Sequence, residues 1–174
     1  MFMKVFYSFL ILITCLILPF DLLSQDVYKS IKYGYSIELP KGYKIWAAIG
    51  EHIDLKAVDK LGNSVIVLIK KLPKEASSIT VDDILQTPNE QWELVLNEFL
   101  PNPHILKKGK TSVDGKNAYY LHYTSQKSKE PKLYGIEYCI FYNGLQYTIT
   151  FSCEDYATDA NSPYFMRALR SFKF

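Results

Sequence analysis

The stretch YCIFYNGLQYTITFSC, residues 138–153, places an Asn-Gly pair between two runs of alternating apolar residues. An Asn-Gly pair flanked in this way is typical of a two-residue type I′ turn between antiparallel strands. With Asn143 and Gly144 in the turn, Tyr142 faces Leu145, and every other pairing in the hairpin follows. Side chains alternate between the two faces of a strand. One face therefore carries Ile136, Tyr138, Ile140, Tyr147, Ile149 and Phe151. We predict that this face packs into the hydrophobic core.

The two cysteines of this stretch, Cys139 and Cys153, fall on opposite faces of the predicted hairpin. Thr148, the partner of Cys139, lies five residues from Cys153, which is about 17 Å at ~3.3 Å per residue. A disulfide needs Cα atoms within ~7 Å of each other. The register therefore predicts no disulfide and no shared metal ion. We expect two free, largely buried thiols that act as small apolar residues.

Further strands precede this hairpin, and their order indicates an antiparallel sheet. Alternating or continuous apolar runs predict strands at residues 35–40, 51–59, 64–72, 104–113 and 117–125. Asp114-Gly115 joins the last two of these as a second type I′ hairpin. Residues 65–69 are apolar on both faces, which predicts a central strand covered on both sides. The two strands nearest the N-terminus alternate more cleanly and are expected nearer an edge of the sheet.

A first helix is predicted after Thr87-Pro88-Asn89-Glu90. This order matches an N-cap threonine, a proline at the first helical position and a glutamate at the third. Its apolar side chains at helical spacing are Trp92, Val95, Leu96, Phe99 and Leu100, with Gln91, Glu93, Asn97 and Glu98 facing outward. Just before it, Thr80 and Asp83 form a capping-box pattern that predicts a short helical turn.

A second helix is predicted to start at Ser162-Pro163. Its buried residues are expected to be Phe165, Met166, Leu169 and Phe172. Strands joined by tight turns and covered by two amphipathic helices indicate the α+β class and a layered sandwich. No internal repeat or long linker interrupts the chain, so residues 25–174 are expected to form a single domain.

The first twenty-five residues differ from the rest of the chain. Lys4 precedes an apolar run over residues 5–20, the pattern of a secretory signal peptide. As a helix, this run would reach only ~24 Å, short of the ~30 Å hydrocarbon core. We predict a signal peptide over residues 1–24, cleaved between Ser24 and Gln25, with no stable membrane span afterwards. Cys15 is interpreted as a passive apolar residue rather than a lipidation site. An uncleaved signal anchor is the alternative.

Composition argues against several functional classes. The formal net charge is +2, and the lysines are spread through the chain, so no nucleic-acid-binding stripe is indicated. The sequence contains none of the motifs for nucleotide binding, serine hydrolysis or zinc proteolysis, and we assign it no cofactor. The neighbouring carboxylates Asp82 and Asp83 stand at a predicted helix start, where the helix dipole already explains them.

Histidines and tyrosines supply the remaining chemical candidates. His52 and Asp54 are two apart on a predicted strand, so they could orient each other or hold a metal. Two ligands do not make a site, and an exposed polar strand face is the favoured interpretation. His122 alternates with Tyr120 on one strand face and is expected to be packed or hydrogen-bonded. The fourteen tyrosines could form a platform for sugars or a protein, but half-buried strand positions explain them better.

Taken together, four stretches resemble the PsbP/Mog-like superfamily, which includes the secreted bacterial DcrB-type proteins. They are YGYSIELPKGYKIW, VDGKNAYYLHY, GLQYTITFSC and FMRALRSFKF, in the order that the family has them. The resemblance implies a three-layer α/β/α sandwich around a central antiparallel sheet. Its members are mostly non-enzymatic, among them an accessory subunit of photosystem II and a Ran-binding protein. No binding residue of those relatives is recognisable here, so no partner carries over.

We therefore expect an exported, periplasmic or secreted, non-enzymatic binding or accessory protein of the cell envelope. Its partner would be another envelope or secreted protein, and no catalytic, cofactor-binding or metal-binding residue is assigned. One alternative is a small secreted hydrolase that uses His52 with Asp54, or His122. The other is a membrane-tethered structural component held by an uncleaved N-terminus.

Overall fold

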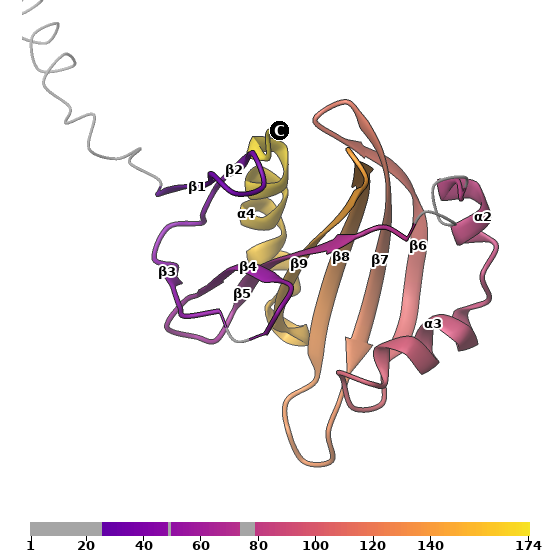
Figure 1. Ribbon diagram of the computed structural model, residues 1–174. Helices are drawn as coiled ribbons and strands as arrows, with labels where there is room; N and C mark the ends of the chain where they lie inside the picture. Colours follow the sequence, from indigo (N-terminus) through magenta and orange to yellow (C-terminus); the bar gives the residue numbers. More distant parts are fainter. Residues whose placement is uncertain (1–25, 49, 74–78) are drawn as a thin grey trace, which may run out of the picture.

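The computed structural model describes residues 26–48, 50–73 and 79–174. The predicted signal peptide, with Cys15 and the Ser24-Gln25 cleavage position, lies outside these residues. A seven-stranded antiparallel sheet, in the order β3-β4-β5-β9-β8-β7-β6, forms the middle of the structure (Figure 1). Its strands are β3 (Lys44–Ile45), β4 (Ile53–Val58), β5 (Ser64–Lys71), β6 (His104–Val113), β7 (Lys116–Ser125), β8 (Leu133–Tyr142) and β9 (Leu145–Glu154).

The β8–β9 hairpin has the predicted register and lies at the centre of the sheet. Tyr142 pairs with Leu145, and Cys139 pairs with Thr148. Asn143 and Gly144 have φ values of +50° and +72°, as a type I′ turn requires. The whole predicted core face is buried, with Ile136, Tyr138, Ile140, Tyr147, Ile149 and Phe151 in one cluster. The prediction drawn from this stretch is confirmed.

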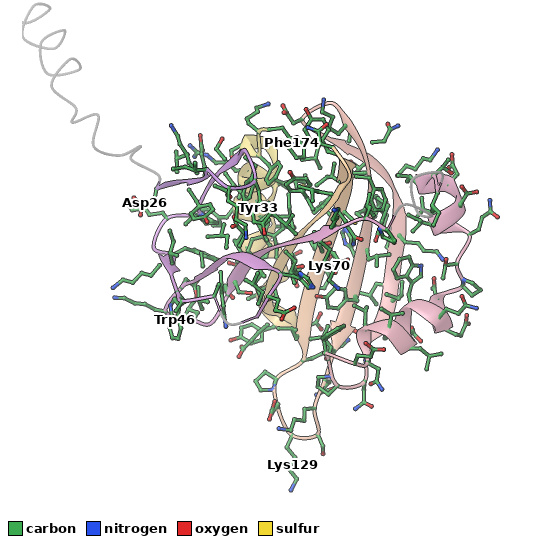
Figure 2. All side chains as sticks on the ribbon, in the orientation of Figure 1. Asp26, Tyr33, Trp46, Lys70, Lys129 and Phe174 are labelled. Carbon is green, nitrogen blue, oxygen red and sulfur yellow. The ribbon has the colours of Figure 1, made fainter. Side chains whose placement is uncertain are left out.

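The β6–β7 hairpin is also confirmed, and the C-terminus is fastened to its turn. Asp114 and Gly115 both have positive φ values, +48° and +72°. The Nζ of Lys173 donates to one carboxylate oxygen of Asp114 at 2.8 Å, and the backbone N–H of Phe174 donates to the other at 3.1 Å. These bonds lower the pKa of the Asp114 carboxyl, the Lys173 side chain contributing most. Beyond β7, a polar loop over residues 126–132 leads to β8, with Lys129 at its tip (Figure 2).

Helices cover both faces of the sheet, so the fold is the expected α/β/α sandwich (Figure 1). On one face, α4 (Thr158–Ser171) buries Phe165, Ala168 and Leu169 in the cluster that holds Phe151. On the other face, α2 (Val81–Leu85) and α3 (Asn89–Leu96) pack over Tyr119, Leu121 and Cys139. Among the helices that the structure describes, none is both long enough and apolar enough to cross a bilayer.

The predicted start of α4 is wrong by five residues, because Pro163 was expected at the first helical position. The helix begins at Thr158, directly after a short 3₁₀ helix, η3 (Asp155–Ala157), so Pro163 lies inside it. The Thr158 hydroxyl donates to the Asp155 carbonyl at 2.7 Å, which joins the two helical segments. Pro163 cannot donate a backbone hydrogen bond to Asp159, but both residues are exposed, and water can reach the unbonded carbonyl.

Helix α3 departs from prediction in its cap and in its buried face. It starts at Asn89 after Pro88, and no side chain caps it, so Thr87 is not the N-cap. It ends at Leu96, which leaves Phe99 outside the helix and 74% exposed, while Val95 is 52% exposed. The helix covers only the edge of the sheet, where Leu96 is buried and Trp92 and Leu100 are partly buried.

Glu93 was expected to face outward, yet it points to the edge strand β6. Its Oε1 accepts from the backbone N–H of Ile105 at 2.9 Å and lies 2.9 Å from Nδ1 of His104. The Glu93 carboxylate thus fastens α3 to the outermost strand of the sheet.

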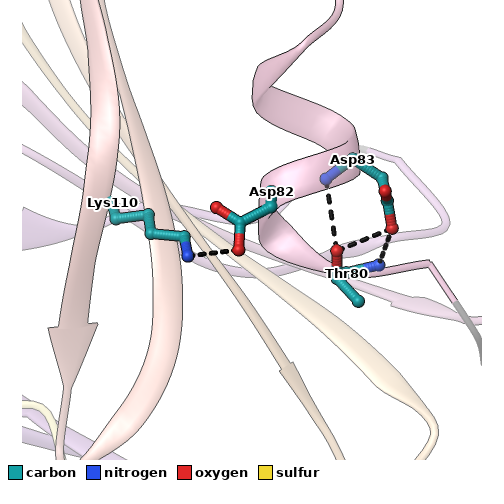
Figure 3. A network of polar contacts seen from close by, with 4 residues as sticks. All are labelled: Thr80, Asp82, Asp83 and Lys110. Atoms are coloured by element: carbon teal, nitrogen blue, oxygen red, sulfur yellow. Dashed lines mark hydrogen bonds and ion pairs between the residues drawn. The ribbon is translucent and has the colours of Figure 1, made fainter.

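Helix α2 has the predicted capping box and is also tied to β6 (Figure 3). The Asp83 N–H donates to the Thr80 hydroxyl at 3.2 Å, and the Thr80 N–H donates to the Asp83 carboxylate at 2.9 Å. Asp82 forms an ion pair with Lys110 of β6. The next lysine toward the N-terminus of β6 on the same side, Lys108, donates to the Thr87 carbonyl. Asp82 and Asp83 therefore have structural roles.

The N-terminal strand prediction was wrong about its place in the fold. β2 (Tyr35–Glu38) does not join the edge of the large sheet but pairs with β1 (Val27–Ser30), a strand that the sequence pattern did not reveal. Ser36 exchanges backbone hydrogen bonds with Lys173, just beyond α4. The Tyr35 ring stacks on Phe172 with centroids 5.0 Å apart. The hairpin thus packs against the C-terminal end of α4.

Strand β5 is covered on one face only, contrary to the prediction. Val65, Val67 and Ile69 are buried under α4 and the β1–β2 hairpin, whereas Ile66 and Leu68 on the other face are half-buried. The reason is that α2 and α3 lie over β6, β7 and part of β8, leaving the β4–β5 side of that face uncovered. The short strand β3 forms the far edge, next to Trp46 (Figure 2).

Candidate binding groove

The structure does not bring His52 and Asp54 together. His52 is exposed in the turn before β4. Asp54 occupies a β-bulge, marked by a register shift between Ile53 and Leu55, and a bulge redirects the side chain. The Asp54 carboxylate accepts hydrogen bonds from the Tyr35 hydroxyl at 2.9 Å and the Tyr28 hydroxyl at 3.3 Å. The expectation of an exposed polar face holds for His52 and is wrong for Asp54, which anchors the β1–β2 hairpin.

The cysteines occupy separate hydrophobic clusters on opposite faces of the sheet. Cys153 belongs to the α4 side, and Cys139 lies beneath α2 and α3. Both are free and buried. Burial raises the pKa of the Cys139 thiol to about 12, so it is not a thiolate at neutral pH. Across the described residues, no three His, Cys, Asp or Glu side chains gather in a way that could hold a metal ion.

A groove of about 470 Å³ lies between α4 and the outer strands β6 and β7, and we call it the α4 groove. It is lined by Lys107, Thr111, Ser112, Val113, Asp114, Tyr120, His122, Tyr138, Met166, Leu169 and Arg170. The groove exists because α4 packs against β9 and the β1–β2 hairpin, near one side of the sheet. The α4-facing sides of β6 and β7 are therefore left beside the helix rather than beneath it.

Tyr120 forms the outer wall of the α4 groove because Gly109 makes room for it. The two residues are paired across β6 and β7. A Cβ atom on Gly109 would lie 2.7 Å from the Tyr120 hydroxyl oxygen, so any larger residue would displace the ring. Lys107 extends over the same ring, with its Nζ 5.5 Å from the ring centroid. A glycine inside a strand was the sequence signal for this close approach.

His122 lies in the α4 groove as a neutral, hydrogen-bonded side chain. Its Nδ1 is 2.6 Å from the Tyr134 hydroxyl, and its ring meets the Tyr120 ring edge to face at 5.2 Å. Burial, and then the nearby Lys107, lower the pKa of His122. The expectation of a packed or hydrogen-bonded histidine fits this geometry. The phenol engages Nδ1, so this nitrogen does not activate Ser112 or Thr111 as a nucleophile.

In the α4 groove, the acidic side chain already has hydrogen-bond partners, whereas two basic side chains have no ion-pair partner among the described residues. Asp114 is already bonded to Lys173 and to the Phe174 backbone. Lys107 and Arg170 are exposed and take part in none of the ion pairs found within the described ranges. The groove therefore combines free cations at its rim with aromatic and aliphatic side chains within. This arrangement suits binding of a ligand and provides no assembled nucleophile and base.

Comparison with known proteins gives a family and a fold. The PsbP family model matches residues 24–174. A search of curated proteins found no match. The solution structure of the cyanobacterial PsbP protein CyanoP from Synechocystis sp. PCC 6803 has a TM-score of 0.66 at 17% identity, covering 86% of this chain and 92% of that one.

Two further structures share the fold. LpqN of Mycobacterium tuberculosis, described as involved in cell envelope biogenesis, has a TM-score of 0.60 at 10% identity, over 86% of this chain and 90% of that one. A variant of the protein Mog1 has a TM-score of 0.58 at 8% identity, over 87% of this chain and 96% of that one. At such identities the likeness concerns the fold alone.

Proposed function

Because the chain belongs to the PsbP family, we propose that it is an exported, non-catalytic accessory protein of the cell envelope that binds another envelope or secreted protein. The observation that carries this proposal is the α4 groove, an open site of about 470 Å³. Ligand sites in proteins commonly have volumes of ~300–1,000 Å³, with mostly apolar walls and a few polar groups. The envelope role assigned to LpqN, which shares the fold, agrees with the proposal.

A non-catalytic role is supported by the fate of the candidate catalytic residues. His52 is exposed to solvent, whereas the Asp54 carboxylate accepts hydrogen bonds from the hydroxyls of Tyr28 and Tyr35. His122 is held neutral against Tyr134. A hydrolase site would need a nucleophile or water held within hydrogen-bond reach of a base, and these three side chains do not provide it.

Export is supported by the apolar run at residues 5–20 and by the proposed cleavage between Ser24 and Gln25. All residues that line the α4 groove lie between positions 107 and 170, so cleavage after Ser24 would leave the groove intact. N-terminal sequencing of the protein from the exported fraction should begin at Gln25. A start at Met1 would instead support the membrane-tethered alternative.

Photo-crosslinking can test the groove as the binding site. Tyr120, half-buried in the outer wall of the α4 groove, would be replaced by a photoreactive phenylalanine derivative of similar shape. The matched control places it at Ser128, exposed in the β7–β8 loop. Illumination of intact cells should yield a discrete envelope-protein adduct from position 120 and not from position 128.

A groove-filling substitution makes this test specific. Thr111→Trp, which adds bulk within the α4 groove, should abolish the adduct from position 120 while circular dichroism shows a folded protein. Identical adducts from positions 120 and 128, or an adduct unaffected by Thr111→Trp, would contradict the proposal.

A further inference from the structure

The rim of the α4 groove carries positive charge without acidic partners in the described part of the chain. Lys107 comes from β6, and Arg170 comes from the last turn of α4. Each is exposed, and none of the ion pairs of the described residues includes either one. Asp114, the carboxylate that lines the groove, is occupied by Lys173 and a backbone N–H. The rim thus offers two free cations to a ligand.

The interior of the groove is apolar and aromatic. Val113, Tyr138 and Leu169 are all buried on its floor. The Tyr138 hydroxyl already donates to the Met166 sulfur at 3.5 Å, so the phenol presents mainly its ring. Tyr120 adds a second ring, fixed over Gly109. A ligand that fits this surface needs an apolar or aromatic group next to its negative charge.

We propose that the α4 groove binds an extended segment of a partner protein in which a Glu or Asp side chain adjoins an aromatic or large aliphatic side chain. The carboxylate lies between Lys107 and Arg170, where a guanidinium can bind it in a bidentate manner. The neighbouring apolar side chain packs between Tyr120 and Leu169. This inference rests on the proposed function and specifies the chemistry of the same site.

A protein segment fits the rim better than a small organic acid or a nucleic acid does. Sites for small ligands usually enclose most of the ligand and fix it with buried polar groups. Here both cations are exposed, which suits a side chain whose backbone remains outside the groove. Nucleic acids engage many cations along a backbone, whereas this site offers two on a chain of net charge +2.

A pair of synthetic peptides tests the charge requirement. The probes are acetyl-Gly-Phe-Glu-Phe-Gly-amide and the same peptide with Gln in place of Glu, titrated into ¹⁵N-labelled protein purified in its exported form. The Glu peptide should shift backbone resonances of Val113, Tyr120, His122 and Arg170. The Gln peptide should bind several-fold more weakly, because exposed ion pairs each change affinity about twofold to fivefold. High salt should remove the difference.

Single substitutions test whether Lys107 and Arg170 cause the preference for the Glu peptide. Lys107→Gln and Arg170→Gln should each weaken binding of the Glu peptide about twofold to fivefold and leave the Gln peptide unchanged. Lys60→Gln, at an exposed position outside the groove, is the matched control and should bind both peptides as the natural protein does. All three positions are exposed, so loss of folding is not expected to obscure the result.

Several results would overturn the inference. Equal binding of the Glu and Gln peptides, no binding of the Glu peptide at millimolar concentration, or shifts confined to residues outside the groove would each do so. If N-acetylphenylalanine bound as tightly as the Glu peptide, the ligand would be a free acid and not a protein segment. Absence of a crosslink from position 120 contradicts the proposed function itself, whereas a crosslink that survives Lys107→Gln with Arg170→Gln contradicts only this inference.

Discussion

At the scale of single residues, the chemistry of Asp54 and His52 differs because of one β-bulge. Sequence alternation places both side chains on the same strand face, but the bulge at Asp54 turns its carboxylate toward Tyr28 and Tyr35. A local irregularity of this kind leaves no signal in hydrophobic periodicity. Asp54 is consequently part of the packing between the N-terminal hairpin and the sheet, and His52 remains in solvent.

Replacing Asp54 should therefore destabilise the protein, whereas replacing His52 should not. Asp54→Ala leaves the buried Tyr35 hydroxyl without its acceptor, which costs about 1–3 kcal/mol of unfolding free energy, whereas the Tyr28 hydroxyl keeps the backbone carbonyl of residue 54 as its acceptor. His52→Ala removes an exposed side chain and should stay within ~0.5 kcal/mol of the natural protein. Urea unfolding followed by circular dichroism measures both, and equal effects would refute this account of the bulge.

Two strand glycines accommodate tyrosine rings but should differ in their tolerance of substitution. A Cβ on Gly135 would lie 2.3 Å from the Tyr123 ring, and Tyr123 is 3% exposed. Gly135→Ala should lower the unfolding free energy by about 1–3 kcal/mol, the usual cost of adding a methylene to a well-packed core. Gly109→Ala meets the half-buried Tyr120, which can swing outward, so its cost should be smaller.

Thermal unfolding of the two glycine variants separates these effects. A lower melting temperature for Gly135→Ala than for Gly109→Ala is expected. Gly109→Ala should still weaken peptide binding, because it displaces the wall of the α4 groove. Partial recovery of stability on adding Tyr123→Leu to Gly135→Ala would show that the ring causes the strain.

At the scale of elements, α2 and α3 show how two similar cap sequences differ in the structure. Thr80 begins a complete capping box with Asp83, and Thr87 caps nothing although Pro88 and Glu90 follow it. Thr80→Ala should lower the unfolding free energy by about 0.5–2 kcal/mol. Thr87→Ala retains the backbone carbonyl that accepts from Lys108 and should have little effect. Denaturant titration of the two variants checks the difference, and similar losses would contradict the assignment of caps.

Sequence analysis predicts the elements whose determinants are local. Asn143-Gly144 and Asp114-Gly115 specify their hairpins through positive φ angles, and the hairpin register then follows from alternation. Burial of a helix depends on what it packs against, and so the exposure of Phe99 and Val95 could not be read from spacing. The position of β2 beside Lys173 depends on residues more than 130 apart in the chain.

The candidate site was recoverable only in part. Tyr120 and His122 were predicted to share a strand face, and both line the α4 groove. Lys107 and Arg170 lie more than sixty residues apart, and only the placement of α4 brings them to one rim. Their isolation from acidic partners is a property of the folded surface, which no local pattern contains.

At the scale of the whole molecule, Glu137 should make stability depend on pH. It is half-buried on the central strand β8, and desolvation raises the pKa of its carboxyl to about 7, with Lys70 opposing the shift. The folded state therefore holds a proton that the unfolded chain releases near 4.5, the ordinary pKa of a glutamate. The contribution of the Glu137 carboxyl to the unfolding free energy should be largest at low pH and should fall as the pH rises from about 4.5 to about 7.

Glu137→Gln should remove this dependence, because the amide resembles the protonated acid and does not ionise. At pH 8 the variant should be more stable than the natural protein by about 1–3 kcal/mol, and at pH 5 the difference should be small. Urea unfolding at the two pH values provides the measurement. Glu98→Gln, at an exposed site, controls for the loss of one negative charge. A Glu137→Gln variant that is less stable at pH 8 would contradict the prediction.

The polar contacts that join β6 to the α2–α3 segment affect how the protein should behave at high concentration. β6 is one of the two outermost strands, and unpaired edges invite strand addition by other copies of a chain. The Glu93 carboxylate accepts from the backbone N–H of Ile105, while Lys108 donates to the Thr87 carbonyl and Lys110 pairs with Asp82 of α2. The opposite edge, β3, is only two residues long. Both edges of the sheet are thus poor templates for fibre growth, so the protein should reach high concentration without assembling edge to edge.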